Sequence, residues 1–248
     1  MDVIGFRYRL LKRGTQVCFE RERMKMKCVC AALLILILVA VHAVCCAEGN
    51  TGRSYVISRV SGDPDWNSIP VILIDRVLWT EDTGIRAQGQ LCYDDEHLYV
   101  HLTAAEEHIR AENTEPLSPV YQDSCLEFFF QAGGSINYFN FEINPNGCLC
   151  SQYGPTKTDR VNLVRDDAVE YFGIRTGRTS DGWEVYYRIP LDYIRLFLPD
   201  VRFEGEWRAN MYKCGDKTLN KHYLSWIPID LEKPNFHCPE FFGTIVFE

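Results

Sequence analysis

The sequence predicts an all-β protein built as an antiparallel β-sandwich, of the jelly-roll or immunoglobulin-like kind, with little helix. Many short segments alternate between apolar and polar residues, as strands with one buried face do. Residues that favour turns, namely Gly, Pro, Asn and Asp, separate these segments, which is typical of sandwiches. Strands are expected at residues 55–60, 86–93, 97–104, 123–130, 138–144, 171–176, 183–189, 207–214, 222–226 and 241–247.

The two strands at 123–130 and 138–144 have the clearest two-sided pattern. In the second of them Phe139, Phe141 and Ile143 share one face, and the first alternates in the same way. The opposite face of the pair carries polar or thiol side chains, which are Asp123, Cys125, Glu127, Tyr138, Asn140, Glu142 and Asn144. Such a row is either a solvated sheet face or a surface for a polar ligand.

Turn chemistry defines the connections between these strands. Residues 144–147 read Asn-Pro-Asn-Gly, which is a strong turn signal. Residues 179–182 connect two strands in the manner of a hairpin. One short helix is expected at 190–197, because Pro190 is suited to a helix start.

The amino-terminal segment has the pattern of an export signal. Lys25 and Lys27 precede an apolar run at 31–41, and small residues follow it. We therefore expect residues 24–47 to be a cleaved signal peptide, 1–23 a non-native upstream extension, and 48–248 a single mature domain. The protein would then be secreted, periplasmic or held at the cell surface. An uncleaved anchor over residues 28–46, or a lipid on Cys45 or Cys46, is the alternative, and either would associate the protein with a membrane.

The charge of the mature domain narrows the range of partners. The whole chain has a net charge of −8, and residues 48–248 hold 18 basic and 31 acidic residues, a balance of −13. Such an acidic domain repels phosphate backbones, so we expect no nucleic-acid partner. Neutral sugars or cations suit the charge better.

Several segments in order resemble the family 9 carbohydrate-binding modules. The resemblance covers about residues 55–248 and rests on Leu98-Tyr-Val100, Asp123-Ser-Cys-Leu-Glu127, Tyr138-Phe-Asn-Phe-Glu-Ile-Asn-Pro-Asn-Gly147, Trp183-Glu-Val-Tyr-Tyr-Arg-Ile-Pro190, Asn210-Met-Tyr-Lys-Cys-Gly215, His222-Tyr-Leu-Ser-Trp226 and Pro239-Glu-Phe-Phe-Gly243. It implies a β-sandwich that binds a terminal sugar without catalysis. Aromatic rings would stack on the sugar, and a carboxylate with amides would bind its hydroxyls.

The resemblance also assigns roles to individual residues. Glu127 stands at the place of a glutamate that binds hydroxyls, and Trp226 matches a late binding tryptophan by order. Asn140 falls where the family has an arginine that contacts sugar. Tyr121 is the aromatic residue just before Asp123, where well-known members have a stacking tryptophan. The predicted carbohydrate site consists of Glu127, Trp226, Asn140, Tyr121, Tyr138 and Glu142.

The remaining tryptophans and cysteines are assigned to the interior or left open. Trp79, Trp183 and Trp207 are expected in the core. The mature domain has six cysteines, at positions 92, 125, 148, 150, 214 and 238. Export permits disulfides among them, but their pairing cannot be read from the sequence. Because Cys125 and Cys214 lie inside family-like motifs, we expect them to be buried free thiols.

Two other classes of function stay open beside sugar binding. A glycan-processing hydrolase, or its accessory domain, is disfavoured because Asp123 and Glu127 would lie roughly 13 Å apart on one strand, farther than glycosidase carboxylates. A haem- or metal-binding sandwich is the third reading. The cysteine and histidine spacings match no C-x₂-C type zinc site. The resemblance leaves room for a structural calcium ion, whose ligands the sequence does not identify.

Overall fold

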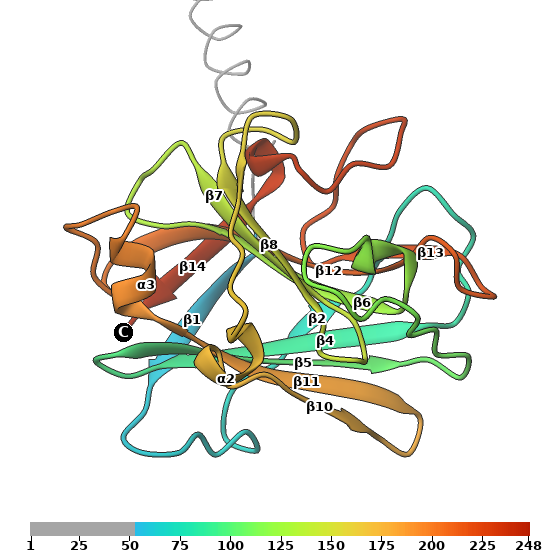
Figure 1. Ribbon diagram of the computed structural model, residues 1–248, viewed down its shortest axis with the longest axis horizontal. Helices are drawn as coiled ribbons and strands as arrows, with labels where there is room; N and C mark the ends of the chain where they lie inside the picture. The colour runs from blue at the N-terminus through green and yellow to red at the C-terminus, as the bar shows by residue number, and fades with distance from the viewer. Residues whose placement is uncertain (1–52) are drawn as a thin grey trace, which may run out of the picture. The chain divides into compact units, whose positions relative to one another are not determined.

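Two layers of strands make up the part of the chain that the computed structural model describes, residues 53–248. The predicted signal peptide and upstream extension lie outside these residues. The first layer holds β14 (Gly243–Phe247), β12 (Glu206–Gly215), β6 (Cys125–Gln131), β7 (Tyr138–Ile143), β8 (Leu149–Gly154) and β9 (Val161–Asn162), with β13 (His222–Ser225) and β3 (Arg76–Val77) beyond β12. The second holds β2 (Ile72–Ile74), β4 (Arg86–Tyr93), β5 (His97–Ala105), β11 (Gly182–Pro190) and β10 (Arg175–Arg178). Figure 1 shows β4, β5, β11 and β10 as one layer across from β6, β7 and β8.

The first strand, β1 (Ser54–Arg59), connects the two layers. Its first four residues pair with β14 and its last two residues pair with β4, both in parallel. The other strand pairings in residues 53–248 are antiparallel. The predicted all-β sandwich is therefore confirmed, with a parallel strand at the junction of its layers.

Helices in the described residues are short, as predicted. The α-helices are α2 (Ala168–Tyr171) and α3 (Leu191–Arg195), and the 3₁₀ turns are η2 (Val120–Gln122) and η3 (Pro239–Phe241). The helix expected after Pro190 is α3. The strand expected at 171–176 is wrong, because α2 ends at Tyr171 and β10 begins only at Arg175. None of the helices in residues 53–248 is long and apolar enough to span a membrane.

The main core lies between the layers and contains the apolar face predicted for β6 and β7. Phe128, Phe130, Phe139 and Phe141 are all fully buried there, and Trp183 of β11 faces them from the second layer. Phe130 stacks on Phe139 with ring centroids 5.1 Å apart. Burial of these large apolar rings stabilises the fold.

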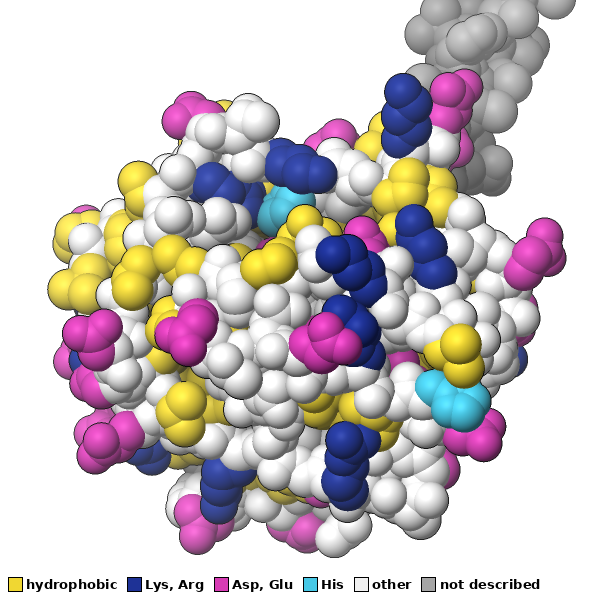
Figure 2. Space-filling view, turned by 45° about the vertical axis from the view of Figure 1, so that its right-hand side comes forward, with side chains coloured by type: hydrophobic (Ala, Val, Ile, Leu, Met, Phe, Trp, Pro, Cys, Tyr) yellow, Lys and Arg dark blue, Asp and Glu magenta, His cyan; other side chains and the backbone are white. Residues whose placement is uncertain are grey.

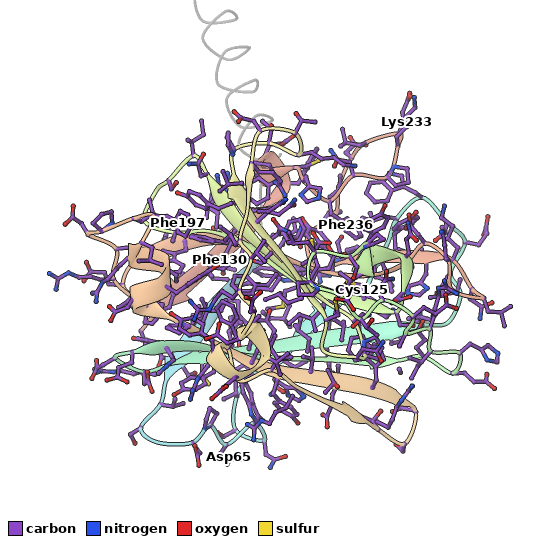
Figure 3. All side chains as sticks on the ribbon, viewed as in Figure 1. Asp65, Cys125, Phe130, Phe197, Lys233 and Phe236 are labelled. Atoms are coloured by element: carbon purple, nitrogen blue, oxygen red, sulfur yellow. The ribbon has the colours of Figure 1, made fainter. Side chains whose placement is uncertain are left out.

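The other face of β6 and β7 is also buried, so the polar row there is not a solvated surface. A second cluster covers it, in which Cys125 and Phe129 of β6 pack against the loop residues Val120, Phe236 and Phe242. Figure 3 labels Cys125 and Phe236 of this cluster, and Phe130 of the main core. The polar side chains of β6 and β7 therefore lie beneath a cap of loops, and the candidate site is formed there.

Candidate functional site

A cavity of about 370 Å³ opens on the capped face of the first layer. Glu127 of β6 and Glu142 of β7 form its floor, together with Cys214 of β12. Glu127 and Glu142 are paired across the two strands, so their side chains project side by side. The alternation of both strands thus places two carboxylates at one point under the loops.

Burial raises the pKa of both carboxyl groups at the floor of the cavity. Desolvation raises the pKa of Glu127 well above its ordinary value, and the neighbouring Cys214 and Glu142 add to this. Desolvation also raises the pKa of Glu142 to about 7, while the positive charge of Arg160 and a hydrogen bond from Asn140 lower it. Near neutral pH the floor can therefore both donate and accept hydrogen bonds.

Aromatic rings form the wall of the cavity. Trp79, Tyr223 and Phe236 line it, and their ring centroids lie 5.6 to 6.0 Å from one another. Tyr121 lines it as well and is 43% exposed. These rings offer flat apolar surfaces beside the carboxylates of the floor.

The backbone at Trp79 is held in an unusual conformation. Its φ is +53°, in the left-handed region that a bulky residue rarely adopts, and this costs roughly 1 kcal/mol or more. The indole Nε1 donates a hydrogen bond of 2.6 Å to the carbonyl of Leu231. This bond ties the ring to the loop that carries Phe236 and so holds one wall of the cavity in its orientation.

The rim of the cavity is polar and of mixed charge. It includes Lys157, Asp216, Asn235 and His237, which come from loops or strand ends. Figure 2 shows Lys and Arg side chains scattered among Asp and Glu on the face it presents, without a continuous basic patch. Because Lys157 and Asp216 both line the cavity, its rim carries charges of both signs.

Behind the floor, Asn140 and Tyr138 position an arginine. Both are fully buried and neither lines the cavity. Nη1 of Arg160 donates to Oδ1 of Asn140 at 2.9 Å and to Nδ1 of His237 at 2.9 Å, and Nη2 donates to the Tyr138 hydroxyl. Asn140 in turn donates to Glu142 at 2.8 Å. The guanidinium of Arg160, which comes from a loop, thus lies beside Asn140, the position at which the family resemblance places an arginine.

The structure therefore brings together part of the predicted site. Glu127, Glu142 and Tyr121 line the cavity, and Asn140 and Tyr138 lie directly behind it. Trp226 does not line the cavity, because it is 3% exposed and belongs to the main core. Tyr223 of β13 faces the cavity, whereas Leu224 of the same strand and Trp226, which directly follows the strand, both belong to the main core.

Trp79, which the sequence places in the core, instead forms a wall of the cavity, while Trp183 and Trp207 are buried as predicted. Cys125 and Cys214 are buried thiols, as expected from their motifs. Sequence reasoning missed Tyr223 of β13 and the loop residues Phe236 and His237. Alternation along β13 could have pointed to Tyr223, which is paired with Cys214 of β12. The other two residues lie in loops, which have no periodic pattern.

Asp123, which leads the predicted motif, supports the loops rather than the cavity. Its Oδ2 accepts hydrogen bonds of 2.8 to 3.0 Å from Asn113, from the backbone N–H of Glu112 and from Asn144. These bonds lower the pKa of its carboxyl despite desolvation. The residue therefore anchors the segment before β6 at the edge of the site.

The described residues thus form a β-sandwich with an aromatic and acidic cavity on the outer face of one sheet. The sequence matches the family model described as carbohydrate-binding family 9 over residues 64–247. The chain belongs to this family. No curated protein matches the sequence.

Solved structures agree with this assignment. A candidate carbohydrate-binding protein from Bacteroides uniformis is 29% identical, with a TM-score of 0.69 over 80% of this chain and 100% of that one. A family 9 module from Caldicellulosiruptor kristjanssonii in complex with glucose is 17% identical, with a TM-score of 0.55 over 79% of this chain and 96% of that one. A family 9 module from Caldicellulosiruptor kristjanssonii in complex with cellotriose is 16% identical, with a TM-score of 0.54 over 79% of this chain and 94% of that one. These last two comparisons show a shared fold.

Proposed function

We propose that this protein binds carbohydrate without catalysis, in the cavity between the loop cap and strands β6, β7 and β12. The observation that carries the proposal is the arrangement of Trp79, Tyr223 and Phe236 around the carboxyl groups of Glu127 and Glu142. Sugars present an apolar face of C–H groups and a polar edge of hydroxyls, and a site with aromatic walls and a few polar groups matches both.

Membership of carbohydrate-binding family 9 supports the same function. The fold is shared with modules solved with glucose and with cellotriose, which makes glucose and short glucans the first ligands to test. We expect the exposed ring of Tyr121 and the indole of Trp79 to contact the sugar ring. Glu127 and Glu142 would exchange hydrogen bonds with its hydroxyls.

The placement of the carboxylates argues against hydrolysis. In glycosidases the two carboxyl groups flank the bond that is cleaved. Glu127 and Glu142 are instead direct neighbours on one sheet face and lie together at the floor. A sugar could meet both only from the same side, so a binding role fits better than an acid and nucleophile pair.

We further propose that the protein meets its ligand outside the cytoplasm. This rests on the signal-peptide pattern of residues 24–47 alone. Amino-terminal sequencing of the native protein tests it, with a mature start near residue 48 expected. A native protein that retains residues 1–23 would contradict the proposed processing.

Isothermal titration with glucose, cellotriose and longer glucans tests the binding proposal. Trp79→Ala should weaken the binding of a sugar ligand about 30-fold, or about 2 kcal/mol, as loss of a central aromatic contact does. Trp66→Ala is the matched control, because Trp66 is a half-buried tryptophan that packs beside Tyr186 of the other sheet. Equal affinities for the two variants would place the ligand elsewhere. Release of shorter sugars during incubation would instead favour the hydrolase.

A further inference from the structure

Three side chains of residue types that can bind metal ions lie close together at the floor of the cavity. Cys125 and Glu127 lie two residues apart on β6, so they point to the same face. Cys214 of β12 is paired directly with Cys125 across the sheet. The sulfur atoms of the two cysteines and a carboxylate oxygen of Glu127 all lie within 4.8 Å of one another.

These three groups are buried together without a basic partner. Their exposed fractions are 0% for Cys125 and 2% for Glu127 and Cys214. The Cys214 thiol donates a hydrogen bond of 3.0 Å to Oε1 of Glu127. Among the salt bridges of residues 53–248 none involves Glu127, and the neighbouring Lys213 is paired at 3.0 Å with Glu106. Once deprotonated, the three groups would need a cation between them.

The donor atoms select the kind of cation. Two thiolates and one carboxylate suit Zn²⁺, whereas Ca²⁺ and Mg²⁺ require oxygen ligands. A tetrahedral zinc ion with Zn–S bonds of about 2.3 Å holds its ligand atoms roughly 3.5 to 3.8 Å apart. Ligand atoms already within 4.8 Å of each other need only small side-chain movements to reach this geometry.

The cavity provides access to the cluster. Glu127 and Cys214 both line it, so an ion can enter from solvent through the opening. Three protein ligands leave a fourth tetrahedral position, which would face the cavity and be available to water or to a ligand oxygen.

We propose that Cys125, Glu127 and Cys214 bind one Zn²⁺ ion at the floor of the cavity. Binding forms two Zn–S bonds and one Zn–O bond. It releases to solvent the two thiol protons, together with the proton of Glu127 in molecules in which that carboxyl is protonated. The site does not depend on sugar binding, because all three ligands come from the strands themselves. Oxidation of the two facing thiols to a cross-strand disulfide is the competing fate of the same pair in an oxidising compartment.

Metal binding by the full chain tests the proposal in the absence of any sugar. The protein is purified with and without reductant, and the reduced form is loaded with Zn²⁺ or Co²⁺ and desalted. We expect about one metal ion per chain by elemental analysis, and a thiolate-to-cobalt charge-transfer band in the near ultraviolet. Cys125→Ser and Cys214→Ser should each abolish the band, and Glu127→Gln should weaken metal retention at least tenfold.

The matched control is Cys150→Ser. Cys150 is a half-buried thiol on β8 in the same sheet and lies outside the cluster, so this variant should retain the metal and the band. Circular dichroism shows whether each variant is folded. If the serine variants do not fold, the stoichiometry and cobalt spectrum of the unaltered protein decide. Absence of bound metal, a spectrum without the thiolate band, or a Cys125–Cys214 disulfide in protein purified without reductant would overturn the proposal.

Discussion

Asn140 and Arg160 are joined by a hydrogen bond of 2.9 Å between Oδ1 of the asparagine and Nη1 of the arginine. The other end of the Asn140 amide donates to Glu142 at 2.8 Å, so one buried side chain connects a guanidinium from a loop to the floor of the cavity. Through this link Asn140, which does not line the cavity, lowers the pKa of the Glu142 carboxyl group, which does.

Asn140→Ala should therefore destabilise the protein. The change leaves Nη1 of Arg160 with fewer acceptors and Oε1 of Glu142 without its donor, and buried polar groups that lose a partner cost about 1–3 kcal/mol. Urea unfolding measures the free energy of unfolding, and sugar affinity should fall in parallel. Asn162→Ala is the control, because Asn162 is exposed and accepts only a surface bond from Gln152. An unfolding midpoint equal to that of the control would contradict the role of Asn140.

Trp226 should behave as a core residue and not as a binding residue. Since it is 3% exposed within the main core, Trp226→Phe should lower the free energy of unfolding by about 1–3 kcal/mol. Sugar affinity per folded molecule should stay within twofold of the unaltered protein. Denaturant unfolding and calorimetric titration of the same preparation measure the two effects. A large loss of affinity without a loss of stability would return Trp226 to the site.

His237 should make the protein less stable in mild acid. Burial, followed by the charges of Arg160 and Lys157, lowers the pKa of its imidazole to about 3. Its Nδ1 accepts a hydrogen bond from Arg160, which requires the neutral ring. The unfolded chain takes up a proton below about pH 6.5 that the folded protein does not. The contribution of the neutral His237 ring to the free energy of unfolding is thus complete above pH 6.5. It is lost as the pH falls below this value, by up to about 1.4 kcal/mol per pH unit.

Unfolding free energies measured between pH 7 and 4.5 test this dependence. His237→Asn should flatten the loss of stability on acidification, because asparagine offers an acceptor that does not titrate. His108→Asn changes an exposed histidine and should leave the slope as it is in the unaltered protein. Identical slopes in all three proteins would show that His237 is not the group responsible.

The sequence was sufficient for the parts of this molecule that follow a period. Alternation in β6 and β7 correctly assigned Phe128, Phe139 and Phe141 to the core, and it placed Glu127 and Glu142 on the opposite face. A period of two fixes the face of every residue in a strand once one is known. It does not say whether the polar face meets solvent, and here loops bury it.

The walls of the cavity could not be predicted in this way. Trp79 and Phe236 come from loops more than 150 residues apart, and nothing periodic in either loop signals that they meet at 5.7 Å. Trp226 matches a binding tryptophan only by its order along the chain, and order does not determine that its side chain, directly after β13, packs into the main core. Arg160 reaches Asn140 through a tertiary contact between a loop and a strand, which a comparison of aligned positions does not reveal.

Tyr121 is the position at which a larger aromatic ring should improve binding. It lines the cavity, is 43% exposed and carries only a weak hydrogen bond from Gln122 at 3.4 Å, so a bulkier ring has room there. Tyr121→Trp enlarges the surface available for stacking on a sugar and should improve affinity by about 0.5–1 kcal/mol, or roughly two- to fivefold. Tyr121→Ala should weaken binding by a similar factor, and neither change should alter stability by more than about 0.5 kcal/mol, since the side chain is at the surface. Titration of both variants with the same glucan, alongside Tyr99→Ala on the other sheet as a control, measures these shifts. If the alanine and tryptophan variants bind equally well, the sugar does not contact this ring, and the stacking contribution must come from Trp79 and the loop that carries Phe236.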